Sequence, residues 1–163
     1  MKKGCLIFSI PIWLWIGWAI YSNVEDVTIG GFKEFGNGRY QFLGPEFIDE
    51  RTGSFIEQGT YTYKKHFPYL YLYGEGGLSR VRYVDFFWLH TEILKIPTRG
   101  YYERHEVKYG KDVQGSWSDM RKKYRNRLHE MDAKDLSAND QEIFLELKER
   151  SEVNGELRYM QEI

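Results

Sequence analysis

Tyrosine is the residue type whose pattern in this chain points most directly to chemistry. The sequence has 163 residues, of which 13 are tyrosine, 10 phenylalanine and 5 tryptophan. Tyrosines that alternate with other residues along a strand line one face of it. A row of such rings can stack on sugars or form an aromatic protein interface. The favoured interpretation is that the rings pack across strands or against the C-terminal helices. The candidate binding residues are Tyr61, Tyr63, Tyr69, Tyr71 and Tyr73.

The residue types that usually carry catalysis form no motif in this sequence. No G-x-S-x-G turn is present, and the single cysteine, Cys5, excludes a disulfide within this chain. Adjacent carboxylates such as Asp49 and Glu50 could serve glycoside hydrolysis, but that reaction needs two carboxylates fixed in space. No two histidines have the i, i+4 spacing of a zinc helix: they are His66, His90, His105 and His129. We expect no catalytic residues, no metal site and no cofactor, and an enzyme is the less favoured hypothesis.

The charge of the chain is close to balanced. Its 23 Lys and Arg residues and 24 Asp and Glu residues give a formal net charge of −1, which provides no general attraction to nucleic acid or anionic lipid. The basic run from Arg121 to Arg127 could meet phosphates on one helix face. The segment 135–152 that follows it is acidic, however, with six acids and two bases. We therefore expect no nucleic-acid partner.

An uncharged run covers residues 4–24, between Lys3 and Glu25. As a helix it would be roughly 31 Å long, close to the ~30 Å hydrocarbon core of a bilayer. Lysines before the run and acids after it predict a single-pass anchor in membrane lipid, with the N-terminus in the cytoplasm and the remaining chain outside. Two alternatives stay open: an export signal that is cleaved, which would release the exported domain, and a buried core helix.

Residues 25–115 are predicted to form an antiparallel β-rich domain, because short alternating segments are separated by turn residues. Residues 101–109 alternate in the same way, and we expect one more strand there. The segment Asp85–Ile96 fits both helical spacing and a buried strand, and Pro97 should end it in either case. Hairpins are expected at the Asn37-Gly38 turn, at the Arg51–Ser54 turn, and between residues 69–73 and 78–84.

Residues 116–163 are predicted to form a pair of helices packed on this β domain. Apolar residues recur at steps of three and four from Trp117 to Met131, after a cap at Ser116. A second helix follows a cap at Ser137, with Ile143, Phe144 and Leu147 as its apolar face. The expected fold is thus α+β: an N-terminal transmembrane helix within residues 1–24, a small antiparallel β-sheet or open barrel, and a C-terminal helical pair.

These features favour a small single-pass membrane protein whose exported domain binds another macromolecule without catalysing a reaction. Another protein is the favoured partner, and an immunity or inhibitor protein directed at an exported toxin or lytic enzyme is one form of this hypothesis. Two alternatives stay open. One is a binder or hydrolase of envelope glycans, in which tyrosines stack on sugar rings. The other is a structural subunit of a membrane assembly, in which the tryptophan-rich anchor is the contact surface.

Overall fold

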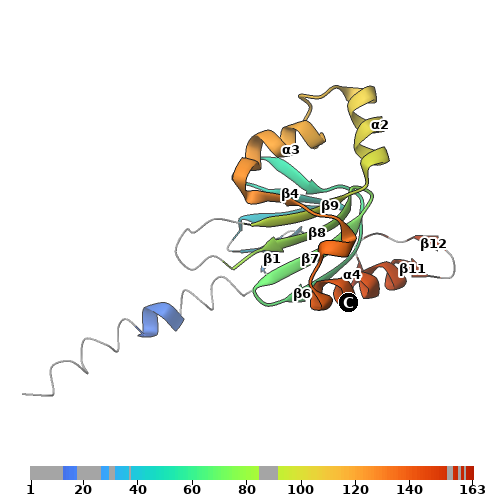
Figure 1. Cartoon of the computed structure of the whole chain (residues 1–163). Helices are drawn as coiled ribbons and strands as arrows, with labels where there is room; N and C mark the ends of the chain where they lie inside the picture. Colours follow the sequence, from blue (N-terminus) through green and yellow to red (C-terminus); the bar gives the residue numbers. More distant parts are fainter. Residues whose placement is uncertain are drawn as a thin grey trace, which may run out of the picture.

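Two open β-sheets lie face to face in this protein, and helices flank them (Figure 1). The computed structural model describes residues 13–17, 27–29, 32–36, 38–84, 92–153, 156–157, 159 and 161–163. The predicted α+β class and the open sheet are confirmed. Within the described residues, however, the β-structure is divided among sheets of five, six and two strands, where a single sheet or barrel was expected.

Within the described residues, five strands build the first sheet as an antiparallel meander in chain order. Each strand pairs with the next one along the chain, because the turns between them are short. The strands are β1 (Val27–Ile29), β2 (Phe32–Phe35), β3 (Tyr40–Leu43), β4 (Glu46–Asp49) and β5 (Ser54–Glu57).

The second sheet has the strand order β10-β9-β8-β7-β6-β13 across the described residues. Its four central strands form an antiparallel meander, and the short outer strands β10 and β13 pair in parallel with β9 and β6. The strands are β6 (Thr60–His66), β7 (Tyr69–Gly74), β8 (Gly77–Arg82), β9 (Ile93–Pro97), β10 (Leu128–Glu130) and β13 (Gln161–Glu162). A separate hairpin consists of β11 (Glu152–Val153) and β12 (Glu156–Leu157).

The three predicted hairpins are confirmed as the pairs β2–β3, β4–β5 and β7–β8. Two of their turns contain a glycine with positive φ, 75° at Gly38 and 59° at Gly53. Glycine adopts this conformation without the steric cost that a Cβ atom brings. Local turn chemistry therefore sets these strand pairings.

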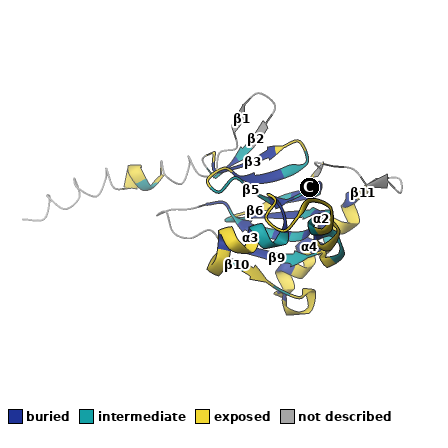
Figure 2. Cartoon of the chain, turned by 90° about the horizontal axis from the view of Figure 1, so that it is seen from above, coloured by how far each residue is buried: buried dark blue, intermediate teal, exposed yellow. Residues whose placement is uncertain are grey.

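Aromatic side chains from both sheets fill the space between them. Phe35, Phe42 and Phe47 of the first sheet are almost fully buried, as is Tyr63 of the second. The ring centroids of Phe42 and Tyr63 are 4.9 Å apart, and those of Phe35 and Tyr63 are 6.2 Å apart. Ring contacts of this kind hold the two sheets together, and Figure 2 shows the buried positions concentrated in the strands.

Helix α4 (Ala138–Ser151) covers the other face of the second sheet, against β6 and β7. Its predicted cap is confirmed, because the Ser137 hydroxyl accepts a hydrogen bond of 3.1 Å from the Asp140 backbone N–H. Its predicted apolar face is confirmed as well, since Ile143, Phe144 and Leu147 are buried. The helix forms a second hydrophobic core with the outer face of this sheet.

Helix α3 (Trp117–Tyr124) begins at the predicted cap, where Ser116 accepts a hydrogen bond of 3.0 Å from the Asp119 backbone N–H. The predicted continuation to Met131 is wrong. Arg125 has a positive φ of 37°, a 3₁₀ turn (η1, Arg125–Arg127) follows, and the next residues form β10 because they pair with β9. The helix packs against β5, and its Tyr124 reaches the core between the sheets.

Helix α2 (Arg99–Tyr109) occupies the segment for which a strand was expected, so that prediction is wrong. The outer edge of β9 is already paired with β10, and the alternation in this segment does not reflect burial. All residues of α2 are described, and Tyr102 alone among them is buried. The helix stands beside α3 and away from α4 in Figure 1.

Several predictions fall partly outside the described residues. Of the proposed anchor, residues 13–17 are described and are helical. None of the helices in the described part of the chain is long and apolar enough to cross a membrane. Of the ambiguous segment Asp85–Ile96, the described end enters strand β9 at Ile93, and Pro97 ends that strand as expected. A second 3₁₀ turn, η2 (Ala133–Asp135), connects β10 to α4.

Candidate functional site

The five predicted binding tyrosines do not share one environment. Tyr63 is buried between the sheets and Tyr71 is buried beneath α4, so both are core residues. Tyr61, Tyr69 and Tyr73 are partly exposed on the outer side of the second sheet. The pattern of alternation therefore identified the strands, while the exposure of each ring depends on what the chain later packs against it.

Tyr71 has a structural role that its contacts define. Its hydroxyl donates a hydrogen bond of 2.7 Å to Asp140 Oδ1, and Arg80 Nη1 donates one of 2.6 Å to Asp140 Oδ2. The Ser137 hydroxyl donates to the same Oδ2 at 2.8 Å. Burial tends to raise the pKa of Asp140, but these hydrogen bonds outweigh it and lower that pKa. The network fixes the first turn of α4 on β7 and β8.

Tyr61 and Tyr73 join a cluster of exposed rings with Tyr159, which the sequence pattern did not place near them. The ring of Tyr61 stacks on that of Tyr159 with centroids 5.0 Å apart, and it contacts the ring of Tyr73 at 5.6 Å. Tyr159 is 48 % exposed. Its hydroxyl donates a hydrogen bond of 2.7 Å to Glu75, in the β7–β8 turn. The cluster therefore ends at that turn.

A second row of rings continues from this turn along one side of α2. Tyr101, His105 and Tyr109 follow one another at i, i+4 spacing, with centroid distances of 6.1 and 4.9 Å. Tyr109 is 52 % exposed. The Tyr101 hydroxyl donates a hydrogen bond to Gln58, whose backbone carbonyl accepts one from the Glu75 N–H.

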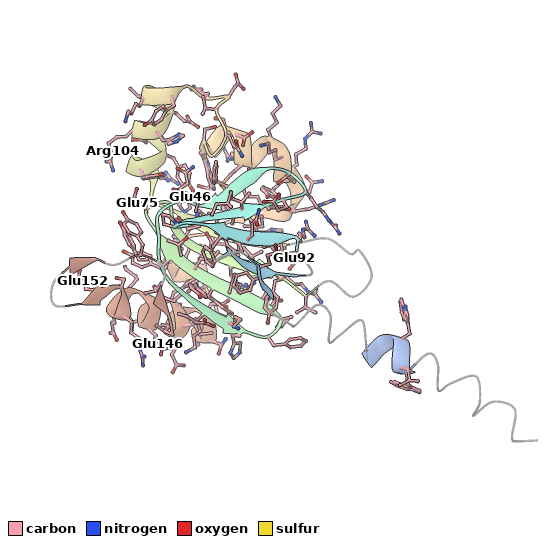
Figure 3. All side chains as sticks on the ribbon, turned by 180° about the vertical axis from the view of Figure 1, so that it is seen from behind. Glu46, Glu75, Glu92, Arg104, Glu146 and Glu152 are labelled. Carbon is pink, nitrogen blue, oxygen red and sulfur yellow. The ribbon has the colours of Figure 1, made fainter. Side chains whose placement is uncertain are left out.

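These two rows are linked at the β7–β8 turn, because Glu75 contacts Tyr159 and Gln58 contacts both Tyr101 and Glu75; we call them together the aromatic band. Figure 3 shows Glu46 and Glu75 together beneath α2, with Glu152 at the end of α4 on the same side. The band thus runs from β6 and β7 to α2 across the β7–β8 turn. Its residues are Tyr61, Tyr73, Tyr101, His105, Tyr109 and Tyr159.

Carboxylates lie close to four rings of the band, Tyr61, Tyr73, Tyr101 and Tyr159, whereas Lys108 Nζ lies 4.7 Å from the ring centroid of Tyr109 at its far end. Burial raises the pKa of Tyr61 and Tyr101, and the charge of Glu75 raises both further. For Tyr159 the hydrogen bond to Glu75 is the main cause of a raised pKa, and for Tyr73 burial comes first. The phenols therefore stay protonated at neutral pH and act as hydrogen-bond donors beside acidic groups.

Glu46 adds an unsatisfied acceptor at the centre of this region. Within the described residues, its Oε2 atom is buried and has no hydrogen-bond partner. Burial raises its pKa, and the neighbouring charges of Glu75 and Glu57 add to that effect. Buried acceptors are usually satisfied because an unpaired one costs about 1–3 kcal/mol.

A buried ion pair packs against the β7–β8 turn. Lys95 of β9 and Glu57 of β5 are fully buried and form a salt bridge, and Lys95 Nζ also donates to the Ser79 hydroxyl at 2.8 Å. Burial lowers the pKa of Lys95 and raises that of Glu57. A Cβ atom at Gly76 would lie 2.6 Å from Glu57 Oε1, so glycine lets the turn close over the pair.

The groups available for chemistry at this surface are aromatic rings, phenols and carboxylates. Within the described ranges, no three His, Cys, Asp or Glu side chains gather closely enough to hold a metal ion. The i, i+4 spacing of Tyr101, His105 and Tyr109 was visible in the sequence and would have identified the α2 row. No local pattern connects Tyr159 to Tyr61, because the two are 98 positions apart and meet only in the folded chain.

Comparisons with known proteins found no match. No family model matches the chain, no curated protein matches its sequence, and no solved structure matches its fold. The class of protein is therefore defined by its two-sheet α+β fold and its aromatic surface, and function is inferred from the residues themselves.

Proposed function

We propose that this chain is a binding protein that captures another protein through the aromatic band. The observation that carries the proposal is the pair of ring rows, one on β6 and β7 and one on α2, that are linked at the β7–β8 turn through Glu75 and Gln58. Protein interfaces are enriched in tyrosine. Its side chain supplies a large contact area and a hydrogen-bond donor, and little conformational entropy is lost when it is fixed.

The accompanying membrane proposal comes from the sequence. Residues 4–24 anchor the chain in lipid and hold the folded part outside the cytoplasm, where it meets its partner. A protein that neutralises an exported toxin or lytic enzyme would have this form, with a non-catalytic domain held at the membrane where the target acts.

Charge complementarity indicates what the partner presents. Glu75 accepts a hydrogen bond from Tyr159 of the band. Glu46 and Glu152 are close enough to raise the pKa of Tyr101 and of Tyr73. Acidic groups beside aromatic rings suit Lys and Arg side chains, whose ammonium or guanidinium groups bind both carboxylates and ring faces. The partner surface is therefore basic, and its association rate should fall as ionic strength rises.

The test compares two exposed positions in the band with one outside it. The double variant Tyr109→Ser, Tyr159→Ser removes rings that are about half exposed, and Phe67→Ser removes a ring that is 55 % exposed at the other end of β6. Full-length protein is captured from its native membrane, and accompanying proteins are identified by mass spectrometry. A partner retained by the wild type and by Phe67→Ser should be lost from the double variant.

The captured partner is then purified for an affinity measurement. We expect roughly a 10- to 100-fold weaker Kd for the double variant, as for loss of two interface tyrosines. Equal affinity of the double variant and the wild type would exclude the aromatic band as the binding surface.

A further inference from the structure

The turn between β6 and β7 lies at the end of the second sheet opposite the aromatic band. Its residues Lys65, His66 and Phe67 are exposed, and Phe67 is 55 % exposed. The next turn along the chain, between β7 and β8, is the one that links the two rows of the band. Strand β7 has 6 residues and separates the two turns by about 20 Å. The β6–β7 turn is thus a surface that the proposed protein partner does not use.

Strand β1 brings the proposed membrane anchor to this same end of the protein. Val27 of β1 pairs with Glu34 of β2, which precedes Gly36 by two residues. A Cβ atom at Gly36 would lie 2.6 Å from the Tyr83 carbonyl oxygen, and the Tyr83 N–H donates a hydrogen bond of 3.2 Å to the Pro68 carbonyl. The chain therefore enters the first sheet at the end that carries the β6–β7 turn.

The connection between the proposed anchor and β1 is short. Only Glu25 and Asp26 stand between residues 4–24 and Val27. A fully extended chain covers at most ~3.3–3.6 Å per residue, so residue 24 and Val27 are at most ~11 Å apart. An orientation with the aromatic band against the lipid would place Val27 about one strand length, ~20 Å, from the bilayer. The connection is too short for that, and the end with the β6–β7 turn faces the lipid.

The lysines of the turn are paired with carboxylates, which leaves the Phe67 ring as its main unpartnered group. Lys65 Nζ lies 3.4 Å from Glu162 Oε1, and Lys64 Nζ forms a salt bridge with Glu146. Phenylalanine enters the boundary between lipid headgroups and acyl chains, because this removes its ring from water. A lipid contact at this turn therefore depends on the ring and needs no anionic lipid.

We infer that the β6–β7 turn contacts the surface of the bilayer that holds the anchor, with the Phe67 ring inserted among the lipid headgroups. This inference rests on the membrane anchor of the proposed function and adds the orientation of the folded part. The β6–β7 turn faces the lipid, and the aromatic band points away from it, where a protein partner can reach the exposed rings.

The test measures the proximity of single positions to lipid by ¹⁹F NMR. Trifluoromethylphenylalanine replaces Phe67, Tyr109 in the band or Leu14 in the anchor, one position per protein, in the full chain in phosphatidylcholine nanodiscs. A lipid with a nitroxide near its headgroup probes positions 67 and 109, and one with a nitroxide deep in its acyl chain probes position 14. We expect at least ~10-fold stronger broadening of the resonance at position 67 than at 109, which lies about a strand length further from the lipid.

A reporter at position 92 separates contact by the Phe67 ring from proximity caused by the short connection. Glu92 is exposed, its carbonyl accepts a hydrogen bond of 3.2 Å from the Arg82 N–H, and Figure 3 shows it toward the opposite end of the protein from Glu75. Phe67→Ser should lower the broadening at position 92 at least ~2-fold, because serine buries less apolar area in lipid. Phe67→Trp should preserve the broadening, since tryptophan is enriched at membrane interfaces.

Position 14 distinguishes the failure of this inference from the failure of the anchor. Broadening at position 14, with no more broadening at position 67 than at 109, would overturn the lipid contact and leave the anchor in place. No broadening at position 14 would remove the anchor, and the inference with it. Equal broadening at position 92 in the wild type and in Phe67→Ser would show that the connection alone sets the orientation, and would overturn the role of Phe67.

Discussion

Helices α4 and α2 differ in how much of their surface is buried against the rest of the protein. Five residues of α4 are buried, Asp140, Ile143, Phe144, Leu147 and Ser151, and its first turn is fixed by hydrogen bonds to β7 and β8. In α2, Tyr102 alone is buried, and Val107 is 89 % exposed. The comparison shows that α4 stabilises the fold through its buried face, whereas α2 contributes one buried side chain and carries the exposed rings of the aromatic band.

The largest expected difference is in how much a substitution in each helix lowers the free energy of unfolding. Leu147→Ala in α4 removes a fully buried side chain and should cost about 2–5 kcal/mol in the free energy of unfolding, through lost burial and a cavity. Val107→Ala in α2 should change it by less than about 0.5 kcal/mol. Urea unfolding of the purified full chain measures both, and equal losses would contradict the division between the helices.

A substitution in the first turn of α4 should cause a smaller, pH-dependent loss in the free energy of unfolding. The folded-state pKa of Asp140 lies below its ordinary value. Its stabilising contribution is therefore complete above the unfolded pKa of about 3.9 and is lost as pH falls through the lower folded pKa. Asp140→Asn should cost about 1–3 kcal/mol at pH 7 and progressively less toward pH 3. If the loss in the free energy of unfolding caused by Asp140→Asn does not change with pH, the charge of Asp140 does not contribute to stability.

The smallest effect concerns the exposed rings of the band. Tyr109→Ser and Tyr159→Ser should each change the free energy of unfolding by less than about 0.5 kcal/mol, because both rings are about half exposed. The same urea titration checks this. Losses above about 2 kcal/mol would place these rings in the core, as the structure places Tyr63 and Tyr71.

Elements with strong local signals could be predicted from the sequence. The hairpins followed from glycine-containing turns, and α4 followed from Ser137 with an apolar face at i, i+3 and i+4. Helix α2 was predicted as a strand because Tyr101 to Tyr109 alternates, although that alternation reflects exposed rings rather than burial. The end of α3 was missed because β10 forms through pairing with β9, which is a tertiary effect.

The aromatic band could be predicted only in part. Tyr61 and Tyr73 were identified from alternation, and both belong to the band. Tyr71 and Tyr63 share that alternation but are covered, one by α4 and the other by the first sheet. Which ring stays exposed depends on packing between distant segments, and a single strand pattern contains no information about that packing.

Site-specific photocrosslinking tests the proposed role of α2 most directly. A photoreactive phenylalanine is placed at position 109 in the band, and in a second protein at position 145 on the exposed side of α4, where Leu145 is 58 % exposed. Irradiation of intact cells that express the full chain should give a discrete protein adduct from position 109 and none from position 145. An adduct from position 145 alone, or from neither position, would contradict the assignment of α2 and the aromatic band as the binding surface.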